Sequence, residues 1–403
     1  MQSNGSVSTA IAEKSSPGRV LYVGQCYYNT WYLSRALRNL GWKADVLNID
    51  PVEHDQMFYH GQDFKFRYGT TKNALGHLIF YLRALRSYDI FHFTGTWNLR
   101  FVSDFDDSGI LPERWDIKLL KKLGKKIAYT NVGCLDGVLQ SSFRTWGPEP
   151  VCDICPWQHR GDVCSDERNR AWGEFRNSVA DYQVTIGGNR KDYNDDPRVH
   201  EVPEFYCLDP AVWNPNLMIP SNYRLPIPAE TVKIYHSIGN YESRTEAATQ
   251  KNIKSTHIYL PLIDRLKAEG HNVELIFFHD VPNKTVRFYQ AQADIVVDML
   301  TYGWFGANIR EALMLGKPSV CFLRPEWVES IRREVPEYIE ELPVISATPE
   351  TVHDILVDLI EHPEKRREIG RRSREFAVKW HSAEAGARKL DRIYQDLLNG
   401  KRE

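Results

Sequence analysis

The chain has 403 residues, of which 42% are hydrophobic and 26% charged, and its formal net charge at pH 7 is −2. This length exceeds one ordinary hydrophobic core and predicts two domains of about 200 residues each. The near-neutral charge excludes the broad basic surface typical of nucleic-acid-binding proteins. No stretch of 18 apolar residues occurs, so we expect no transmembrane helix.

Residues 1–18 are polar and rich in Ser, Ala and Gly, and we expect them to form a disordered leader. They lack the apolar segment of a secretory signal peptide, which favours a cytoplasmic protein. Seven cysteines in such a protein are expected to be reduced thiols or metal ligands rather than a disulfide framework.

In the first half, residues 19–207, short apolar runs alternate with segments whose apolar residues recur at helical spacing. The runs that predict strands end at Gly, Asp or Pro, and lie at 19–24, 44–49, 88–95, 126–133, 181–188 and 199–203. Helices are predicted at 30–40, 75–85 and 115–123, and a long loop at 50–71. This alternation predicts an α/β domain with a doubly wound parallel sheet, in which ligands bind at the carboxyl ends of the strands.

The segment 208–230 holds five prolines and little periodicity, and we expect it to link two domains. The α/β pattern then restarts over 231–382. Strands are predicted at 232–239, 273–279, 293–300, 319–323 and 343–347, and helices at 256–269, 283–292 and 349–361. A final helix is expected within 383–403.

The stretch 293–318 combines a buried strand, a loop from Gly303 to Gly306, and a short helix from Asn308 to Met314. Backbone N–H groups and the helix dipole make such a junction suitable for phosphate or ribose. Glu311 lies early in this helix. Because most glycine loops of this type only serve a turn, the assignment of a ligand site depends on the rest of the chain.

Three segments of the second half, 236–256, 291–298 and 303–318, resemble the donor-binding domain of nucleotide-sugar glycosyltransferases of the GT-B fold, especially the retaining family four. The strongest match is GWFGANIREALMLGKP at 303–318. The segment 376–382 resembles the family's final helices, which cross back to the first domain. The resemblance implies two Rossmann-like domains facing across a cleft, with the acceptor on 19–207 and the donor on 231–382.

The activity implied is transfer of a sugar, with retention, from a UDP- or GDP-sugar to a glycan, a lipid-linked glycan or a small molecule. In this family the acceptor hydroxyl attacks the face from which the phosphate leaves, and the phosphate takes its proton, so no covalent nucleophile is needed. A sugar-nucleotide epimerase of the same fold and a non-catalytic sugar- or nucleotide-binding protein remain alternatives. A lipid-linked acceptor would bring the protein to the inner membrane face, and residues 119–126 hint at a basic amphipathic helix.

The resemblance also assigns site residues. Lys254 matches the family's phosphate-binding lysine, and Arg244 is the second candidate cation for stabilising the departing diphosphate. Solvated surface charges are the alternative for both. Glu311 matches the glutamate that accepts hydrogen bonds from the ribose hydroxyls, although it could instead cap its helix. The remaining expected donor-binding residues are Gly239, Asn240, Gly303, Phe305, Gly306, Ala307 and Asn308.

The sequence departs from the family at two positions. Gly303 stands where a glutamate usually contacts the donor sugar, and Asp298 is too distant to be assumed a substitute, so the donor sugar is undetermined. The family's usual histidine after the fourth strand is absent. Asp136 and His92 are candidate polar groups facing the cleft, and either could be a structural residue instead.

Four cysteines form a separate pattern: Cys134 follows a predicted strand, and Cys152, Cys155 and Cys164 share one loop. Four thiols with a C-x-x-C pair suit tetrahedral zinc, which would order a loop that lacks a hydrophobic core. His159 could replace one ligand. An iron–sulfur cluster, a redox dithiol and unrelated free thiols are the alternatives.

Overall fold

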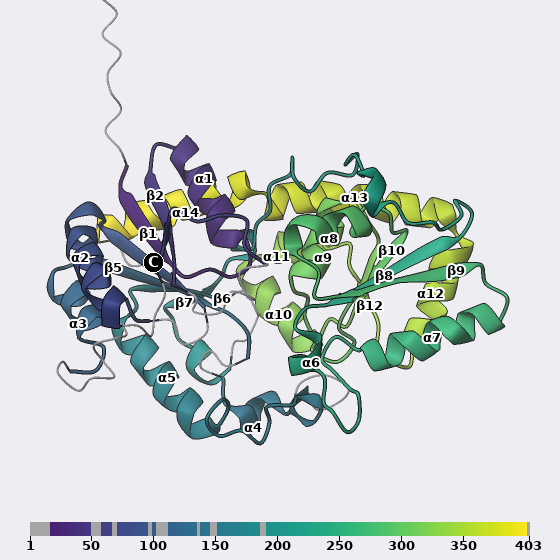
Figure 1. The fold of residues 1–403 in the computed structure, drawn as a ribbon, viewed down its shortest axis with the longest axis horizontal. Helices are drawn as coiled ribbons and strands as arrows, with labels where there is room; N and C mark the ends of the chain where they lie inside the picture. The colour runs from purple at the N-terminus through teal and green to yellow at the C-terminus, as the bar shows by residue number, and fades with distance from the viewer. Residues whose placement is uncertain are drawn as a thin grey trace, which may run out of the picture.

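The computed structural model describes residues 17–49, 58–66, 71–95, 99–101, 112–134, 138–145, 151–185 and 191–400. Two parallel sheets, each flanked by helices, lie side by side along the long axis of the molecule (Figure 1). This is the expected α/β class with two Rossmann-like halves. Among the described residues no helix is long and apolar enough to cross a membrane.

The first half contains a seven-stranded sheet in the order β3-β2-β1-β4-β5-β6-β7. Its strands are β1 (Arg19–Val23), β2 (Lys43–Asn48), β3 (Phe64–Lys65), β4 (Ile90–Thr94), β5 (Lys126–Asn131), β6 (Tyr182–Thr185) and β7 (Val199–Glu201). The helices of this half are α1 (Asn29–Asn39), α2 (Thr71–Ser87), α3 (Trp115–Lys122), α4 (Gln140–Phe143) and α5 (Asp166–Val179). The central strands β1 and β4 are almost completely buried, as expected for a sheet covered on both faces.

The second half contains a five-stranded parallel sheet in the order β12-β11-β10-β8-β9. Its strands are β8 (Val232–Ile238), β9 (Val273–His279), β10 (Ile295–Val297), β11 (Ser319–Cys321) and β12 (Ile345–Ser346). The helices are α6 (Tyr241–Arg244), α7 (Thr256–Ala268), α8 (Asn283–Gln290), α9 (Ala307–Met314), α10 (Pro325–Glu334), α11 (Pro336–Glu341) and α12 (Val352–Glu361).

Two consecutive helices join the halves: α13 (Pro363–His381) runs along the second half, and α14 (Ala383–Leu398) runs along the first, both yellow in Figure 1. Ser382 separates them and caps α14, since its hydroxyl accepts a hydrogen bond from the Ala385 N–H at 3.1 Å. The Trp42 indole donates to Asp391 of α14 at 2.7 Å. One cluster of buried apolar residues extends through both halves and through these two helices.

Several elements differ from the sequence prediction. The helix α5 was not predicted because only five of its residues are buried, among them polar Asn169 and Arg176, so it has no clear apolar period. β3 lies inside the stretch predicted as one long loop, and β10 is shorter than the run 293–300. The two sheets lie on either side of 208–230, and the domain limits at that linker remain predictions.

Candidate functional site

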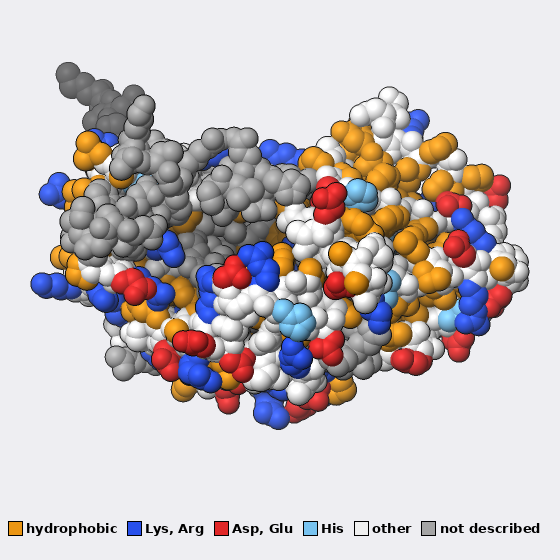
Figure 2. Space-filling model, turned by 60° about the horizontal axis from the view of Figure 1, so that its bottom comes forward, with side chains coloured by type: hydrophobic (Ala, Val, Ile, Leu, Met, Phe, Trp, Pro, Cys, Tyr) orange, Lys and Arg blue, Asp and Glu red, His pale blue; other side chains and the backbone are white. Residues whose placement is uncertain are grey.

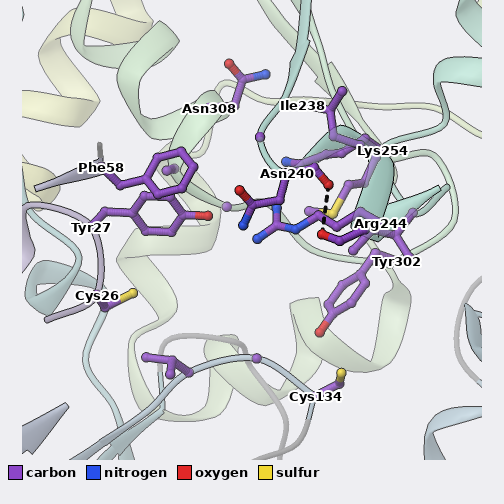
Figure 3. A pocket seen from close by; sticks show the side chains of 18 of the residues that line it. Cys26, Tyr27, Phe58, Cys134, Ile238, Asn240, Arg244, Lys254, Tyr302 and Asn308 are labelled. Carbon is purple, nitrogen blue, oxygen red and sulfur yellow. Dashed lines mark hydrogen bonds between the residues drawn. The ribbon is translucent and has the colours of Figure 1, made fainter. Parts of the chain in front are cut away.

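A cavity of about 830 Å³ lies between the two halves. Loops that follow the carboxyl ends of β1, β4 and β5 line it on one side, and loops that follow β8 and β10 line it on the other. Figure 3 shows Tyr27 and Phe58 of the first half facing Asn240 and Arg244 of the second. Parallel α/β sheets bind ligands at these strand ends, and this volume accommodates a ligand of several hundred daltons.

Glu311 is held in the wall of this cavity and is only 3% exposed. Its Oε1 accepts hydrogen bonds from the Tyr28 hydroxyl at 2.8 Å and from Asn283 Nδ2 at 3.0 Å. Its Oε2 accepts one from Gln290 Nε2 at 2.8 Å. Burial raises the pKa of Glu311 above its ordinary value, although these hydrogen bonds act in the opposite direction.

The same carboxylate connects the two halves. Tyr28 precedes α1 in the first half, whereas Glu311 belongs to α9 in the second. A second link runs from the His60 Nε2 of the first half to the Asn283 Oδ1 of α8, at 2.6 Å. The other His60 nitrogen accepts a hydrogen bond from the Tyr32 hydroxyl, and burial lowers the pKa of His60 to about 4. A neutral imidazole therefore takes part in this interdomain network.

Lys254 also lines the cavity, but its charge is already compensated. Its Nζ lies 2.8 and 3.0 Å from the two carboxylate oxygens of Asp298, which is completely buried. Asp298 thus acts as the partner of the lysine, a role that its position in the sequence did not indicate. Arg244, the last residue of α6, lines the cavity and makes no ion pair within the described part of the chain.

Only some residues of the glycine loop before α9 line the cavity. Gly306, Ala307 and Asn308 line the cavity, as do Gly239 and Asn240 after β8. Phe305 is completely buried against Trp327, with ring centroids 5.6 Å apart. The expected donor-binding residues Gly303 and Phe305 are not among the described residues that line the cavity.

Gly303 has a structural reason to be glycine. Its φ is +93°, and a Cβ there would lie 2.8 Å from the Cβ of Arg324. The Arg324 N–H also donates to the Gly303 carbonyl at 2.8 Å. A glutamate at this position would require the loop to move.

His92 and Asp136 were the candidate polar groups of the first half. His92 is completely buried in β4, and its ring nitrogens lie 2.6 Å from the Tyr394 hydroxyl and 2.7 Å from the Thr130 hydroxyl. Burial lowers the pKa of His92 to about 3. It therefore connects the first sheet to α14 and is a structural residue. Asp136 lies outside the described residues.

All four cysteines of the predicted metal site line the same cavity. Cys134 follows β5, and it interacts electrostatically with the thiols of Cys152, Cys155 and Cys164. Burial raises the pKa of Cys152 to about 12, and it raises the pKa of Cys134 as well. Within the described residues, no group of three or more His, Cys, Asp or Glu side chains already has an arrangement that could hold a metal ion.

The segment that carries the four cysteines also contacts the second half. Phe143 of α4 packs edge-on against Tyr302, with ring centroids 5.2 Å apart. Cys134 and Tyr302 lie on the same side of the cavity in Figure 3. Tyr302 directly precedes Gly303, so the first half touches the loop that leads into α9.

Sequence reasoning did not identify Tyr28, His60 and Asn283 as site residues. Tyr28 stands in the loop after the first strand, where ligand-binding residues are common, but nothing in the sequence pairs it with Glu311, 283 positions away. His60 lies in the stretch predicted as a loop, and Asn283 stood at a predicted helix start. Only the packing of the two halves brings these residues together.

Comparison with protein-family models gives no match, and comparison with curated proteins gives none. Among solved structures, sucrose-phosphate synthase from Thermosynechococcus elongatus is similar with a TM-score of 0.56, at 14% identity over 95% of this chain and 100% of that chain. Anabaena HepE in complex with UDP and glucose has a TM-score of 0.54, at 12% identity over 94% of this chain and 99% of that one. Its complex with UDP-glucose has a TM-score of 0.55, at 11% identity over 94% and 100%. At such identities the likeness establishes architecture, and the chain has the GT-B fold of these glycosyltransferases.

Proposed function

We propose that the protein is a glycosyltransferase that moves a sugar from a nucleotide-sugar donor to an acceptor hydroxyl. The observation that supports this most is the position of Glu311. It is a buried carboxylate of α9 in the wall of a cavity between two Rossmann-like halves, one turn after the N-terminus of that helix. Solved structures of the same fold contain UDP and UDP-glucose, so UDP-sugars are the first donors to test.

In this proposal Glu311 accepts a hydrogen bond from a ribose hydroxyl. A carboxylate has about four acceptor positions, and three are used within the protein, so one remains on Oε2. A second ribose hydroxyl could bind only if Tyr28 or Asn283 gave up its hydrogen bond to Oε1. Donor binding would therefore be coupled to the contact between the two halves.

The diphosphate would lie against Arg244, Lys254 and the first N–H groups of α9, at Gly306, Ala307 and Asn308. Arg244 supplies the uncompensated charge, because Asp298 neutralises much of the charge of Lys254. Gly239 and Asn240 complete this side, and Asn240 is held by a 2.6 Å hydrogen bond from its N–H to Asp280.

The reaction proposed is substitution at the anomeric carbon with retention. The bond from that carbon to the diphosphate oxygen breaks, the acceptor oxygen bonds to the carbon on the same face, and the acceptor proton passes to the leaving phosphate. The acceptor is a glycan, a lipid-linked glycan or a small molecule bound against the first half. Asp136 remains a proposed polar group at this side of the cleft, while Gly303 and Phe305 support the donor loop from behind.

We also propose a structural zinc ion at Cys134, Cys152, Cys155 and Cys164. The C-x-x-C spacing supports it, as does the position of all four thiols at the same cavity, with Cys134 in electrostatic contact with the other three; coordination would have to draw the thiols closer together. Metal analysis of protein purified without chelator should find about one zinc per chain, and Cys155→Ser should lose it. Protein with neither zinc nor iron would refute the metal site.

The test of the transferase proposal is a panel of UDP-, GDP-, ADP- and CDP-sugars incubated with the purified protein. Release of the nucleoside diphosphate is measured, and NMR identifies the sugar and its anomer. The expected result is release from one donor class that increases with an acceptor and is lost in Arg244→Ala, which removes the cavity cation that has no ion-pair partner among the described residues. Isomerisation of the intact nucleotide sugar without acceptor would identify an epimerase. Binding without any turnover would identify a non-catalytic binding protein.

A further inference from the structure

One amide side chain in the wall of the cavity is buried without a hydrogen-bond partner. Gln25 lies just beyond the carboxyl end of β1, lines the cavity and is 6% exposed. Neither its Nε2 nor its Oε1 has a partner among the described residues. Water satisfies polar side chains at the surface, such as the Lys, Arg, Asp and Glu along the lower edge in Figure 2, but a buried amide depends on partners inside the molecule.

Amides elsewhere in the same wall are bonded. Gln140 donates to the Gln158 carbonyl at 2.7 Å, and Asn169 donates to the Val138 carbonyl at 2.8 Å. Folded proteins leave few buried polar groups unpaired, because such a group loses its hydration and gains no bond in return. The exception at Gln25 indicates a partner that enters through the cavity.

A second unpaired group, the Tyr206 hydroxyl, lies near the same loop. Tyr206 is 2% exposed and lines the cavity, and its hydroxyl has no hydrogen-bond partner within the described part of the chain. Cys26 and Tyr27, which follow Gln25, act electrostatically on this hydroxyl, and Figure 3 shows the side chains of both at the cavity. The guanidinium carbon of Arg310 lies 4.2 Å from the centroid of the Tyr206 ring and packs on it. An amide and a hydroxyl, both unpaired, thus border one part of the cavity.

Hydroxyl groups match both of these unpaired groups. A carboxamide donates through its nitrogen and accepts through its oxygen, and a hydroxyl does either. Two adjacent hydroxyls of a sugar can therefore bind one amide with two hydrogen bonds, one in each direction. Tyr27 and Phe58, which also line the cavity, pack edge to face with ring centroids 5.4 Å apart and offer apolar surface to the C–H face of a sugar ring. An apolar acceptor would leave the amide unpaired, and a site that depends on such hydrogen bonds discriminates strongly against it.

We propose that Gln25 and Tyr206 bind the hydroxyls of a carbohydrate acceptor. The inference rests on the proposed transferase function and narrows its acceptor to a sugar residue, free or within a larger glycan, rather than an apolar small molecule. Both residues belong to the first half and act apart from Glu311, which is assigned to the nucleotide. The unpaired amide destabilises the protein without acceptor, and the bound sugar relieves that cost. Removing the amide should therefore weaken acceptor binding without destabilising the fold.

The test begins with labelled full-length protein on an array of immobilised glycans, with and without the nucleoside diphosphate that binds best. Wild type should bind a group of related glycans, and the best of them serves as the acceptor in transfer assays. Gln25→Met, which keeps the volume but removes both hydrogen-bonding atoms, should raise the KM for that acceptor about tenfold and leave nucleotide affinity unchanged. Tyr206→Phe should raise this KM about threefold. Both variants should melt at the same temperature as wild type or at a higher one.

Gln183→Met is the matched control. Gln183 of β6 is completely buried and its Nε2 donates to Asn177 at 3.0 Å, so this variant should melt at a lower temperature and keep the KM of wild type.

Binding to no glycan, or an acceptor KM that Gln25→Met leaves unchanged, would overturn the proposal. A lower melting temperature of Gln25→Met would show a structural residue instead, and weaker nucleotide binding by this variant would place Gln25 at the donor; either result also overturns it. Transfer to 4-nitrophenol but to no glycan would overturn the carbohydrate acceptor and leave the transferase function standing. Glycan binding that requires Gln25, in a protein that binds no nucleotide sugar, would support the sugar site and refute the transferase function.

Discussion

Replacing Glu311 by glutamine tests the nucleotide end of the site with little change in volume. The carboxylate is 3% exposed and accepts three hydrogen bonds, which leaves one acceptor position, on Oε2, for a ribose hydroxyl. Glutamine has one oxygen instead of two and no charge. A hydrogen bond to a charged group contributes about 1.5–3 kcal/mol, so the dissociation constant of the nucleoside diphosphate should rise about ten- to hundredfold.

The assay is isothermal titration calorimetry with the nucleoside diphosphate that binds best, and with its 2′-deoxy and 3′-deoxy analogues. If Glu311 binds a ribose hydroxyl, the analogue lacking that hydroxyl should bind wild type and Glu311→Gln within about twofold of each other. Glu329→Gln, on the exposed surface of α10, is the control for loss of one negative charge. Equal affinity of wild type and Glu311→Gln for the ribonucleotide would refute the assignment, provided both proteins unfold at similar temperatures.

Three further predictions concern stability and the wall of the cavity. Burial lowers the pKa of His60 in the folded protein to about 4, from its ordinary 6.5. As the pH falls, His60 of the unfolded chain is therefore protonated before His60 of the folded protein, and this stabilises the unfolded chain. The free energy of unfolding should thus drop by roughly 2–3 kcal/mol more between pH 6.5 and 4 in wild type than in His60→Gln, as measured by urea denaturation. Gly303→Ala should lower the free energy of unfolding by about 1–3 kcal/mol, because the φ of +93° disfavours alanine and the added Cβ would lie too close to Arg324. Gly306→Ala should lower it much less, because no atom lies within 4 Å of the added Cβ. Lys254→Met should destabilise by about 3–5 kcal/mol by leaving Asp298 buried and unpaired, and adding Asp298→Asn should recover most of this loss; no recovery would show that the pair is not formed.

The architecture could be predicted from the sequence because its signals are local. Apolar runs ending at Gly, Asp or Pro correctly placed β1, β4 and β8, since buried parallel strands need such runs wherever they occur. The GT-B fold was anticipated from the motifs of the second half, and the structural comparisons confirm it. By contrast, α5 is anchored by a buried Arg176 that bonds Asn131 and Asn194, and a polar anchor leaves no hydrophobic period to detect.

The site was less predictable because its contacts join distant parts of the chain. Glu311 could be singled out from its motif, but its bond to Tyr28 depends on how the two halves pack. Phe305 looked like a donor-binding residue because it stands in the glycine loop, yet the loop turns its ring into the core. Likewise, Leu75, Ile79 and Leu82 have the spacing of a core face, and only the structure shows that they are exposed.

The most direct test of the account is a crystal structure of the protein with the nucleotide sugar that the donor panel identifies. The account predicts the nucleotide in the cavity between the halves, with a ribose hydroxyl at hydrogen-bonding distance from Glu311. The diphosphate should lie against Arg244, Lys254 and the N-terminus of α9. A nucleotide bound elsewhere, or one in this cavity with its ribose turned away from Glu311, would contradict it.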